Sequence, residues 1–381
     1  MIRTGQYEYQ PGQGWKALRP LPAGSGSQQL TLIFGDRELL RRSAWMDDLS
    51  ILSPDGQWIA ASTAGEIADS STRDASIIAT VIRFEHTKFR IAAADVGNSP
   101  DSAEAGRRLG RMLRAPDLRY LLVLSDGQVV NGSELALGIA SEVPPGVPIT
   151  GGLAGDAARF EQTLVGYNES PQPGRIVAAG FYGEALHVGH GSMGGWDRFG
   201  PERLITRSDR NVLYELDGQN ALELYKRYLG PYADELPGSA LLFPLNVHAE
   251  GQEQPVTRTI LNIDEARGAM IFAGDMPLHA RAQLMRANFD QLIDGSESAA
   301  RDSLQAFGPE AAQVAILISC VGRKLILGPR ADEEVEVVRS MIGPEAAICG
   351  FYSYGELCPS GAGMPCELHN QTMTITTLRE A

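Results

Sequence analysis

Short runs of apolar and small residues alternate with amphipathic segments along most of this chain. LTLIF at 30–34 and WIAAS at 58–62 have the length and composition of buried strands. Asp36 follows the first run and can cap a helix that leads to the second. The second run ends at a Gly65-Glu66 corner. The pattern therefore predicts a strand, a helix and a strand, closed by a glycine and a carboxylate.

The same unit recurs twice further along the chain. Its second copy comprises strands at 120–124 and 147–149, a helix at 133–140 and a corner at Gly155-Asp156. Its third copy comprises strands at 314–319 and 346–348, a helix at 332–342 and a corner at Gly355-Glu356. Recurrence of one unit indicates internal duplication. Because strand alternates with helix, the sequence predicts an α/β (mixed α+β) fold, with duplicated units that form β-sheets covered by helices in two related halves.

Segments between the copies predict the domain organisation. Residues 76–94 and 175–191 alternate apolar and polar residues around a turn, as half-exposed hairpins do. Residues 1–27 are rich in Gly, Pro, Gln and Ser, so we expect a tail laid over the surface. The remaining chain then divides into an N-terminal domain, 28–215, and a C-terminal domain, 216–381.

Polar side chains gather where the last strand begins. Glu356 closes the third corner, and His369, Asn370 and Gln371 directly precede the alternating strand TMTIT at 372–376. A plain edge strand needs none of these donors and acceptors, so they indicate a site. The alternative is that Glu356, His369 and Asn370 only cap and satisfy a tight loop.

Composition narrows the classes of function. The 381 residues suffice for a substantial core, and 43% hydrophobic and 21% charged residues are typical of soluble globular proteins. A net charge of −14 argues against nucleic acid and anionic membrane as partners, because both attract basic surfaces. The N-terminus lacks an apolar signal segment, and no run of about 18 apolar residues follows. We therefore expect a cytoplasmic protein.

The four cysteines, Cys320, Cys349, Cys358 and Cys366, all lie near the C-terminus. They are too few for the disulfide framework of a secreted protein. Their spacing does not match the short knuckles of structural zinc sites. Cys349, Cys358 and Cys366, with Cys320 or His369 as the fourth member, are candidates for a four-ligand metal set or a redox switch, and the alternative is ordinary buried cysteines.

Common catalytic motifs are absent from the sequence, including a Walker lysine loop, HExxH, CxxC and GxSxG. A hydrolase-like enzyme would use Glu66, Asp156, Glu356 and His369 as acid and base groups tuned by burial. No nucleophile beside a base can be named in the sequence, so we expect a protein that is not an enzyme.

Convergence of the corners predicts a binding site. If the duplicated halves bring the corners to the LHNQ entrance at 368–371, an interdomain pocket forms, and a small ligand bound there shifts the two halves. The residues expected around it are Ser62, Thr63, Gly65, Glu66, Gly152, Asp156, Tyr352, Tyr354, Glu356, His369, Asn370 and Gln371. A third interpretation is a scaffold without a ligand, in which these motifs only hold the fold.

Four motifs resemble signatures of the FIST domain family. They are ASTAGEI at 61–67, GGLAGD at 151–156, GFYSYGEL at 350–357 and CELHNQTMTITTLRE at 366–380. In this order they resemble an N-terminal and a C-terminal FIST half, from about residue 28 onward. The resemblance implies a sensory module for signal transduction that binds a small ligand such as an amino acid.

The resemblance also implies a candidate cofactor and partners. Some stand-alone family members bind heme, sense nitric oxide and regulate a separate histidine kinase or cyclic-di-GMP enzyme. Heme that senses nitric oxide commonly keeps one imidazole ligand, because the gas competes for the other axial position. We favour His369, then His190, whose flanking glycines leave room for a macrocycle, with Cys358 and Cys366 as thiolate alternatives. We expect an output partner on a separate protein. A homodimer is an alternative that the sequence does not decide.

Overall fold

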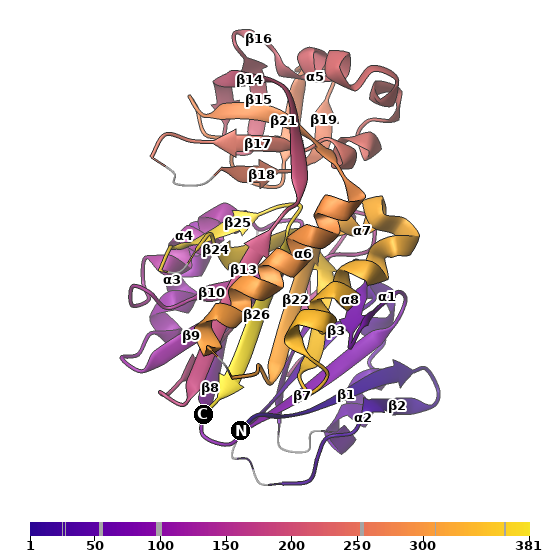
Figure 1. Ribbon diagram of the computed structural model, residues 1–381, viewed down its shortest axis with the longest axis vertical. Coiled ribbons are helices and arrows are strands. Elements are labelled where there is room, and N and C mark those ends of the chain that lie inside the picture. Colours follow the sequence, from indigo (N-terminus) through magenta and orange to yellow (C-terminus); the bar gives the residue numbers. More distant parts are fainter. Residues whose placement is uncertain are drawn as a thin grey trace.

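The structure is a computed structural model that describes residues 1–24, 26, 28–52, 56–96, 101–251, 255–308, 310–361 and 363–381. The chain forms a large body that holds both termini and a small lobe, residues 196–287, that stands on one end of the body (Figure 1). Three six-stranded sheets build the body, and a further sheet builds the lobe. The mixed α+β class expected from the sequence is confirmed.

Each strand, helix and strand unit lies at the centre of its own body sheet. Unit 1 contains β3 (Gln28–Gly35), α1 (Arg37–Leu40), α2 (Ala44–Leu52) and β4 (Gln57–Ser62). Unit 2 contains β9 (Leu118–Ser125), α4 (Gly132–Ala140) and β10 (Ile149–Leu153). Unit 3 contains β22 (Val314–Cys320), α7 (Val321–Leu327), the 3-10 turn η4 (Gly328–Arg330), α8 (Ala331–Ile342) and β23 (Ala347–Ser353). In each unit the two strands are parallel neighbours, as a helical crossover allows.

The units also share the pattern of their neighbouring strands. The first strand of each unit pairs on its other side with β7 (Ile77–Phe84), β12 (Arg175–Tyr182) or β26 (Met373–Glu380), respectively. After the corners come short strands that join the sheet of another unit, namely β5 (Glu66–Ala68) beside β23, β11 (Val165–Tyr167) beside β4 and β24 (Gly355–Pro359) beside β10. The strands β6 (Ser71–Arg73) and β25 (Cys366–His369) extend two of these edges. The body therefore repeats one pattern three times.

The first residues of the chain are part of this pattern and not a surface tail. They form β1 (Arg3–Gln10) and β2 (Gly14–Arg19), and β1 pairs with β7. β1 thereby takes the place beside β7 that β8 (Lys88–Asp95) has beside β12 and that β13 (Leu186–Met193) has beside β26. Without β1, the backbone groups of β7 would form an open sheet edge. This pairing corrects the prediction of a tail at 1–27, in which the Gly and Gln content hid a strand.

One apolar core fills the space between the three body sheets. Side chains alternate along a strand, and one set from each first strand enters this core, namely Leu30, Leu32 and Phe34, Tyr120, Leu122 and Leu124, and Val314, Ile316 and Ile318. Helices cover the opposite faces (Figure 1): α1 and α2 on the sheet of unit 1, α3 (Ser102–Leu113) and α4 on that of unit 2, and α6 (Phe289–Leu304) and α8 on that of unit 3. The 3-10 turn η3 (Gln305–Phe307) follows α6. Among the described residues, no helix is long and apolar enough to cross a membrane.

The small lobe has its own sheet and its own core. Its strands are β14 (Trp196–Asp209), β15 (Val212–Leu216), β16 (Gln219–Asn220), β17 (Leu245–His248), β18 (Val256–Arg258), β19 (Ile260–Asp264), β20 (Ala269–Phe272) and β21 (Arg281–Ala287). Its helix α5 (Ala221–Leu229) and the turns η1 (Gly230–Glu235) and η2 (Gly238–Leu242) complete it. The division predicted at 215/216 falls inside β15, because the lobe interrupts a body to which both halves of the chain contribute strands.

Candidate functional site

The three corners meet at the end of the body that carries the small lobe. Backbone hydrogen bonds join each corner to the other two, namely Ala64 N to Tyr352 O (2.8 Å), Gly155 N to Ser62 O (2.9 Å) and Tyr354 N to Leu153 O (3.0 Å). Gly65 has a φ of +132°, and a Cβ there would lie 2.1 Å from Lys324 Nζ. A Cβ at Gly152 would lie 2.7 Å from Ile318 Cγ2 in the central core. The structure therefore brings together the corner residues named from the sequence.

The first and third corners hold their carboxyl groups with hydroxyls. Thr63 Oγ1 donates to Glu66 Oε1 (2.5 Å) and Ser76 Oγ to Glu66 Oε2 (2.6 Å). In the third corner Ser353 Oγ donates to Glu356 Oε1 (2.6 Å) and Thr372 Oγ1 to Glu356 Oε2 (3.0 Å). Burial raises the pKa of Glu66 to about 7 and that of Glu356 to about 8, although the hydroxyls act in the opposite direction. Both groups therefore exchange protons near neutral pH.

The second corner holds Asp156 with a cation. Arg37 Nη1 lies 2.7 Å from Asp156 Oδ2, and both side chains are buried. The phenol of Tyr354 donates to the same carboxylate. The amides of Phe160, Glu161 and Gln162 also donate to it, at 2.9 to 3.1 Å. The carboxyls of all three corners are at most 1% exposed, so a ligand can contact them only after the corners separate.

The LHNQ entrance lies at the junction between the small lobe and the body. Lobe and body are joined there by Arg258 Nη1 to Leu368 O (2.8 Å), Thr259 N to Asn370 Oδ1 (3.4 Å), Gln371 Nε2 to Leu241 O (3.2 Å) and Trp196 Nε1 to Gln371 O (2.8 Å). Gln371 has a φ of +62°, which turns the chain sharply before β26. The LHNQ segment, which the sequence predicts at the start of a strand, is therefore the part of the body that contacts the lobe.

Three polar atoms at this junction, Asn370 Nδ2, Gln371 Oε1 and Thr259 Oγ1, have no hydrogen-bond partner within the described chain. Their residues are 0%, 0% and 3% exposed, respectively. Buried side-chain amides and hydroxyls are nearly always paired in native proteins. Thr259 belongs to the lobe, whereas the two amides belong to the body, so the unpaired atoms draw on both parts of the molecule.

Arg258 adds a buried positive charge to the same junction. Its guanidinium donates to the backbone oxygens of Asp275 (3.0 Å) and Leu368 (2.8 Å). Burial lowers its pKa to about 10, while the charges of Asp275 and Glu367 act in the opposite direction. The Arg258 side chain is still a cation at neutral pH. The next residue in the sequence is Thr259, whose hydroxyl is unpaired.

A second buried arginine fixes the base of the lobe. Arg323 and Glu334 form an ion pair of 2.8 Å in which both side chains are 0% exposed. Arg323 also donates to Gly194 O, just before the chain enters the lobe, and to Leu292 O (2.8 Å), just after it returns. No sequence pattern indicates that Arg258, Arg323 and Glu334 are buried, because a lone charged residue in a helix or strand is typical of a solvent-facing position.

Two of the candidate metal ligands, His190 and His369, lie near Cys358. His190 Nδ1 is 4.0 Å from Cys358 Sγ, and His369 Nε2 is 3.0 Å from Cys358 O. Burial lowers the pKa of both imidazoles. The four cysteines are free and buried, and burial raises their thiol pKa values, for Cys349 to about 12. Within the residues that the structure describes, no three His, Cys, Asp or Glu side chains are arranged to hold a metal ion.

A cavity of about 670 Å³ opens beside His190, and Met193, Asp302 and Met364 are among the residues that line it. The glycines that flank His190 also contact helix α6. A Cβ at Gly189 would lie 1.8 Å from Ser303 O, and one at Gly191 would lie 2.2 Å from Ala299 O. These glycines let α6 pack closely on β13, and both also line the cavity beside His190.

Comparison with known proteins agrees with this architecture. The family model of the FIST N domain matches residues 29–219, and that of the FIST C domain matches residues 221–359. No curated protein matches the chain. The matched regions contain all three recurring units, their corners and the small lobe. The chain therefore belongs to the FIST family.

Proposed function

We propose that this FIST protein is a sensory module, and not an enzyme, that binds a small polar ligand at the junction between its small lobe and its body. FIST domains are associated with sensory signal transduction and with small-ligand binding. The observation that carries the site is the set of unpaired buried atoms on Thr259, Asn370 and Gln371. An unpaired buried polar group costs about 1–3 kcal/mol, and a ligand that pairs with these atoms removes that cost.

The chemistry of the junction favours an amino acid or a similar zwitterion. The amide Nδ2 of Asn370 and the Arg258 guanidinium are donors suited to a carboxylate, and Gln371 Oε1 is an acceptor suited to an ammonium group. Repulsion between the corner carboxyls and a ligand carboxylate is reduced, because Asp156 is paired with Arg37 and the pKa of Glu356 is raised to about 8.

Binding at the junction couples the ligand to the orientation of the lobe relative to the body. Because the unpaired atoms come from both the lobe and the body, a ligand there changes the balance between orientations of the lobe. Arg323 holds the points where the chain enters and leaves the lobe, so the lobe moves about this base. We propose that a separate histidine kinase or cyclic-di-GMP enzyme reads the orientation.

Isothermal titration of the purified protein with a panel of amino acids tests the proposal. At least one member is expected to bind, and Asn370→Ala is expected to weaken its affinity by about tenfold or more, since a hydrogen bond to a charged group is lost. The matched control is Asn262→Ala, which removes an exposed asparagine of β19 in the lobe. Absence of binding by every amino acid of the panel, or an Asn370→Ala variant that binds as tightly as the parent protein, would overturn the proposal.

Heme at the cavity beside His190 is a second candidate. The cavity volume of about 670 Å³ lies in the range of sites for small molecules and cofactors. Burial lowers the pKa of His190, which favours the neutral imidazole that ligates iron. Heme would supply an iron centre that binds nitric oxide. His369 fits less well because its Nε2 contacts Cys358 O, and Cys358 and Cys366 fit less well because burial disfavours their thiolates.

A heme titration followed by absorbance separates this candidate from the first. We expect His190→Ala to remove or shift the Soret band, whereas His187→Ala should leave it unchanged. His187 is a matched control because it is an exposed histidine of the same strand, β13. Absence of heme uptake, or equal spectra of the two variants, would exclude an imidazole ligand at this position.

A further inference from the structure

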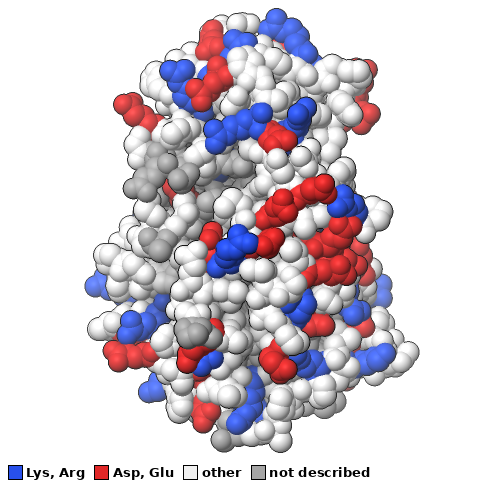
Figure 2. Space-filling model, viewed as in Figure 1, with Lys and Arg blue, Asp and Glu red and all other residues white. Residues whose placement is uncertain are grey.

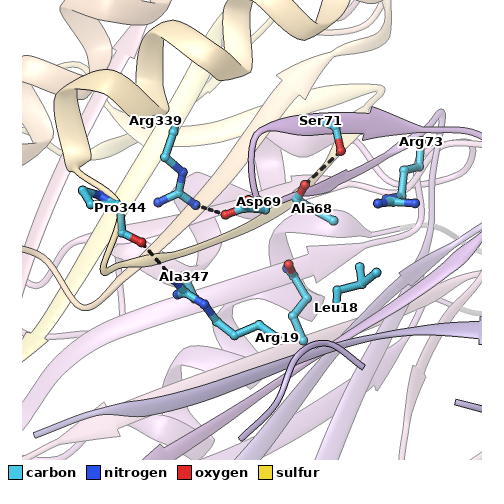
Figure 3. Close-up of a pocket in the computed structure, with 10 residues that line it drawn as sticks. Leu18, Arg19, Ala68, Asp69, Ser71, Arg73, Arg339, Pro344 and Ala347 are labelled. Atoms are coloured by element: carbon cyan, nitrogen blue, oxygen red, sulfur yellow. Dashed lines mark hydrogen bonds and ion pairs between the residues drawn. The ribbon is translucent and has the colours of Figure 1, made fainter. Parts of the chain in front are cut away.

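A second cavity, unrelated to the junction, lies between the N-terminal hairpin and the edge of the unit 3 sheet (Figure 3). It has a volume of about 360 Å³. Its walls come from β1 and β2, from the β5–β6 edge, and from the end of α8 with the start of β23. Because β1 and β2 precede residue 29, this cavity combines the matched FIST core with a segment outside the family match.

Three arginines enter this cavity from different elements, namely Arg19 from β2, Arg73 from β6 and Arg339 from α8 (Figure 3). Arg19 donates to Pro344 O (2.9 Å) and Glu345 O (3.0 Å), and Arg339 donates to Gly343 O (2.7 Å) and Ala346 O (2.8 Å). These backbone contacts hold two guanidinium groups in place without neutralising them.

Two of these arginines keep buried donors without a partner. The Nε atoms of Arg73 and Arg339 form no hydrogen bond with any described residue. Burial lowers the pKa of Arg339, the charge of Asp69 acts against this, and the like charge of Arg19 adds to it. Repulsion between Arg19 and Arg339 is the kind of unfavourable term that a bound anion removes.

Local charge in the cavity contrasts with that of the whole protein. The chain carries a net charge of −14, and acidic side chains gather over α6 and α8 on the face seen in Figure 2. Two carboxylates contact the three arginines: Asp69, which lines the cavity, contacts Arg339, and Glu8, from outside the lining, contacts Arg73 at 3.0 Å. The site therefore keeps an excess of one positive charge in an acidic protein.

We propose that this cavity binds a small phosphorylated molecule. Guanidinium groups bind phosphate oxygens through paired, charge-assisted hydrogen bonds. The volume of about 360 Å³ exceeds that of a bare phosphate, and Leu18, Pro344 and Ala347 supply an apolar wall for the rest of the molecule. The site is independent of the proposed junction ligand, because its walls share no residue with the junction.

Calorimetric titration of the full chain with inorganic phosphate and with inorganic pyrophosphate tests this inference, with succinate as the carboxylate arm and chloride at equal ionic strength as the blank. We expect saturable binding of pyrophosphate that is tighter than binding of succinate and that weakens as salt rises. Binding of succinate without either phosphate, or heats equal to those of chloride, would overturn the proposal.

Two variants with opposite expected effects make the test specific. Arg73→Gln is expected to weaken pyrophosphate binding by about tenfold, since one charged donor is lost. Asp69→Asn is expected to strengthen binding several-fold, because it releases Arg339 from its carboxylate partner. Asn tolerates the positive φ of 57° at this position, so the backbone is undisturbed. The control Arg301→Gln changes an exposed arginine of α6 and should bind like the parent. Effects of the same sign for Arg73→Gln and Asp69→Asn would contradict the site.

Discussion

The three corners occupy equivalent places in the repeated pattern, yet they hold their buried carboxyl groups in two ways. Glu66 and Glu356 are each surrounded by hydroxyls, Thr63 and Ser76 in one case and Ser353 and Thr372 in the other. Asp156 instead has a guanidinium, a phenol and three backbone amides.

The difference shows what a buried carboxyl group requires. Hydroxyls satisfy hydrogen bonds but supply no charge, so burial raises the pKa of Glu66 and Glu356 and makes the proton part of the structure. At the second corner the buried guanidinium of Arg37 instead places the opposite charge beside the carboxyl group of Asp156. Two corners should therefore respond to pH, whereas the second should respond to loss of its cation.

The largest effect is expected from Arg37→Met. This change leaves the buried Asp156 carboxylate without its cation, which should lower the free energy of unfolding by about 3–5 kcal/mol in urea denaturation. The exposed Arg42→Met is the control and should cost less than about 0.5 kcal/mol. Adding Asp156→Asn to Arg37→Met should recover part of the loss. Equal stabilities of Arg37→Met and Arg42→Met would show that the second corner does not depend on its ion pair.

Titration of the carboxyl groups in the first and third corners should make the free energy of unfolding depend on pH. In the folded protein the pKa of Glu66 is about 7 and that of Glu356 about 8, against 4.5 for the ordinary group. Between these values the folded state binds more protons than the unfolded state, so the free energy of unfolding falls as pH rises from about 5 to 8. The slope per group is at most about 1.4 kcal/mol per pH unit.

Glutamine variants separate this effect from the rest of the protein. Glu66→Gln and Glu356→Gln should each flatten the fall, whereas Glu336→Gln, at an exposed position of α8, should leave it unchanged. Denaturant unfolding at several pH values measures the slopes. A parent protein whose stability rises steadily over this window, or variants with unchanged slopes, would show that these carboxyls do not titrate as described.

A smaller effect is expected when a single hydroxyl is removed. Ser353→Ala and Thr63→Val each delete one donor to a corner carboxyl, and each should cost about 1–2 kcal/mol of unfolding free energy. Loss of the donor should also raise the pKa of the partner carboxyl and move the fall in stability to higher pH. Ser340→Ala, which removes an exposed hydroxyl of α8, is the control. A Ser353→Ala variant as stable as this control would show that the hydroxyl contributes little to the free energy of unfolding.

Sequence patterns predicted what is local in this molecule and failed where partners are distant. The recurring units could be predicted because apolar runs and corners lie close together in the chain. Arg37 and Asp156 are separated by 119 positions, and no pattern in either segment points to the other. The sequence predicts a tail at β1 because the partner strand, β7, begins only at Ile77.

The candidate site shows the same limit. Asn370 and Gln371 were found because polar residues interrupt the entrance of a strand, but their contact with the lobe depends on Thr259, 111 positions away from Asn370. No local sequence pattern predicts that Arg258 and Arg323 are buried, since their burial follows from packing between elements that are distant in the chain. The glycines beside His190 stand out in the sequence, but their close contact with α6 depends on a helix that is distant in the chain.

The most direct measurement of the central claim is the distance between the lobe and the body with and without ligand. Spin labels at Leu137→Cys in α4 and Leu261→Cys in β19 report it, since both positions are exposed and the native cysteines are buried. A distance distribution that shifts when the binding amino acid is added, and that no longer shifts in the Asn370→Ala background, is the predicted result. A distribution that stays the same with every amino acid of the panel, or that shifts equally in both backgrounds, would contradict a ligand site at the junction.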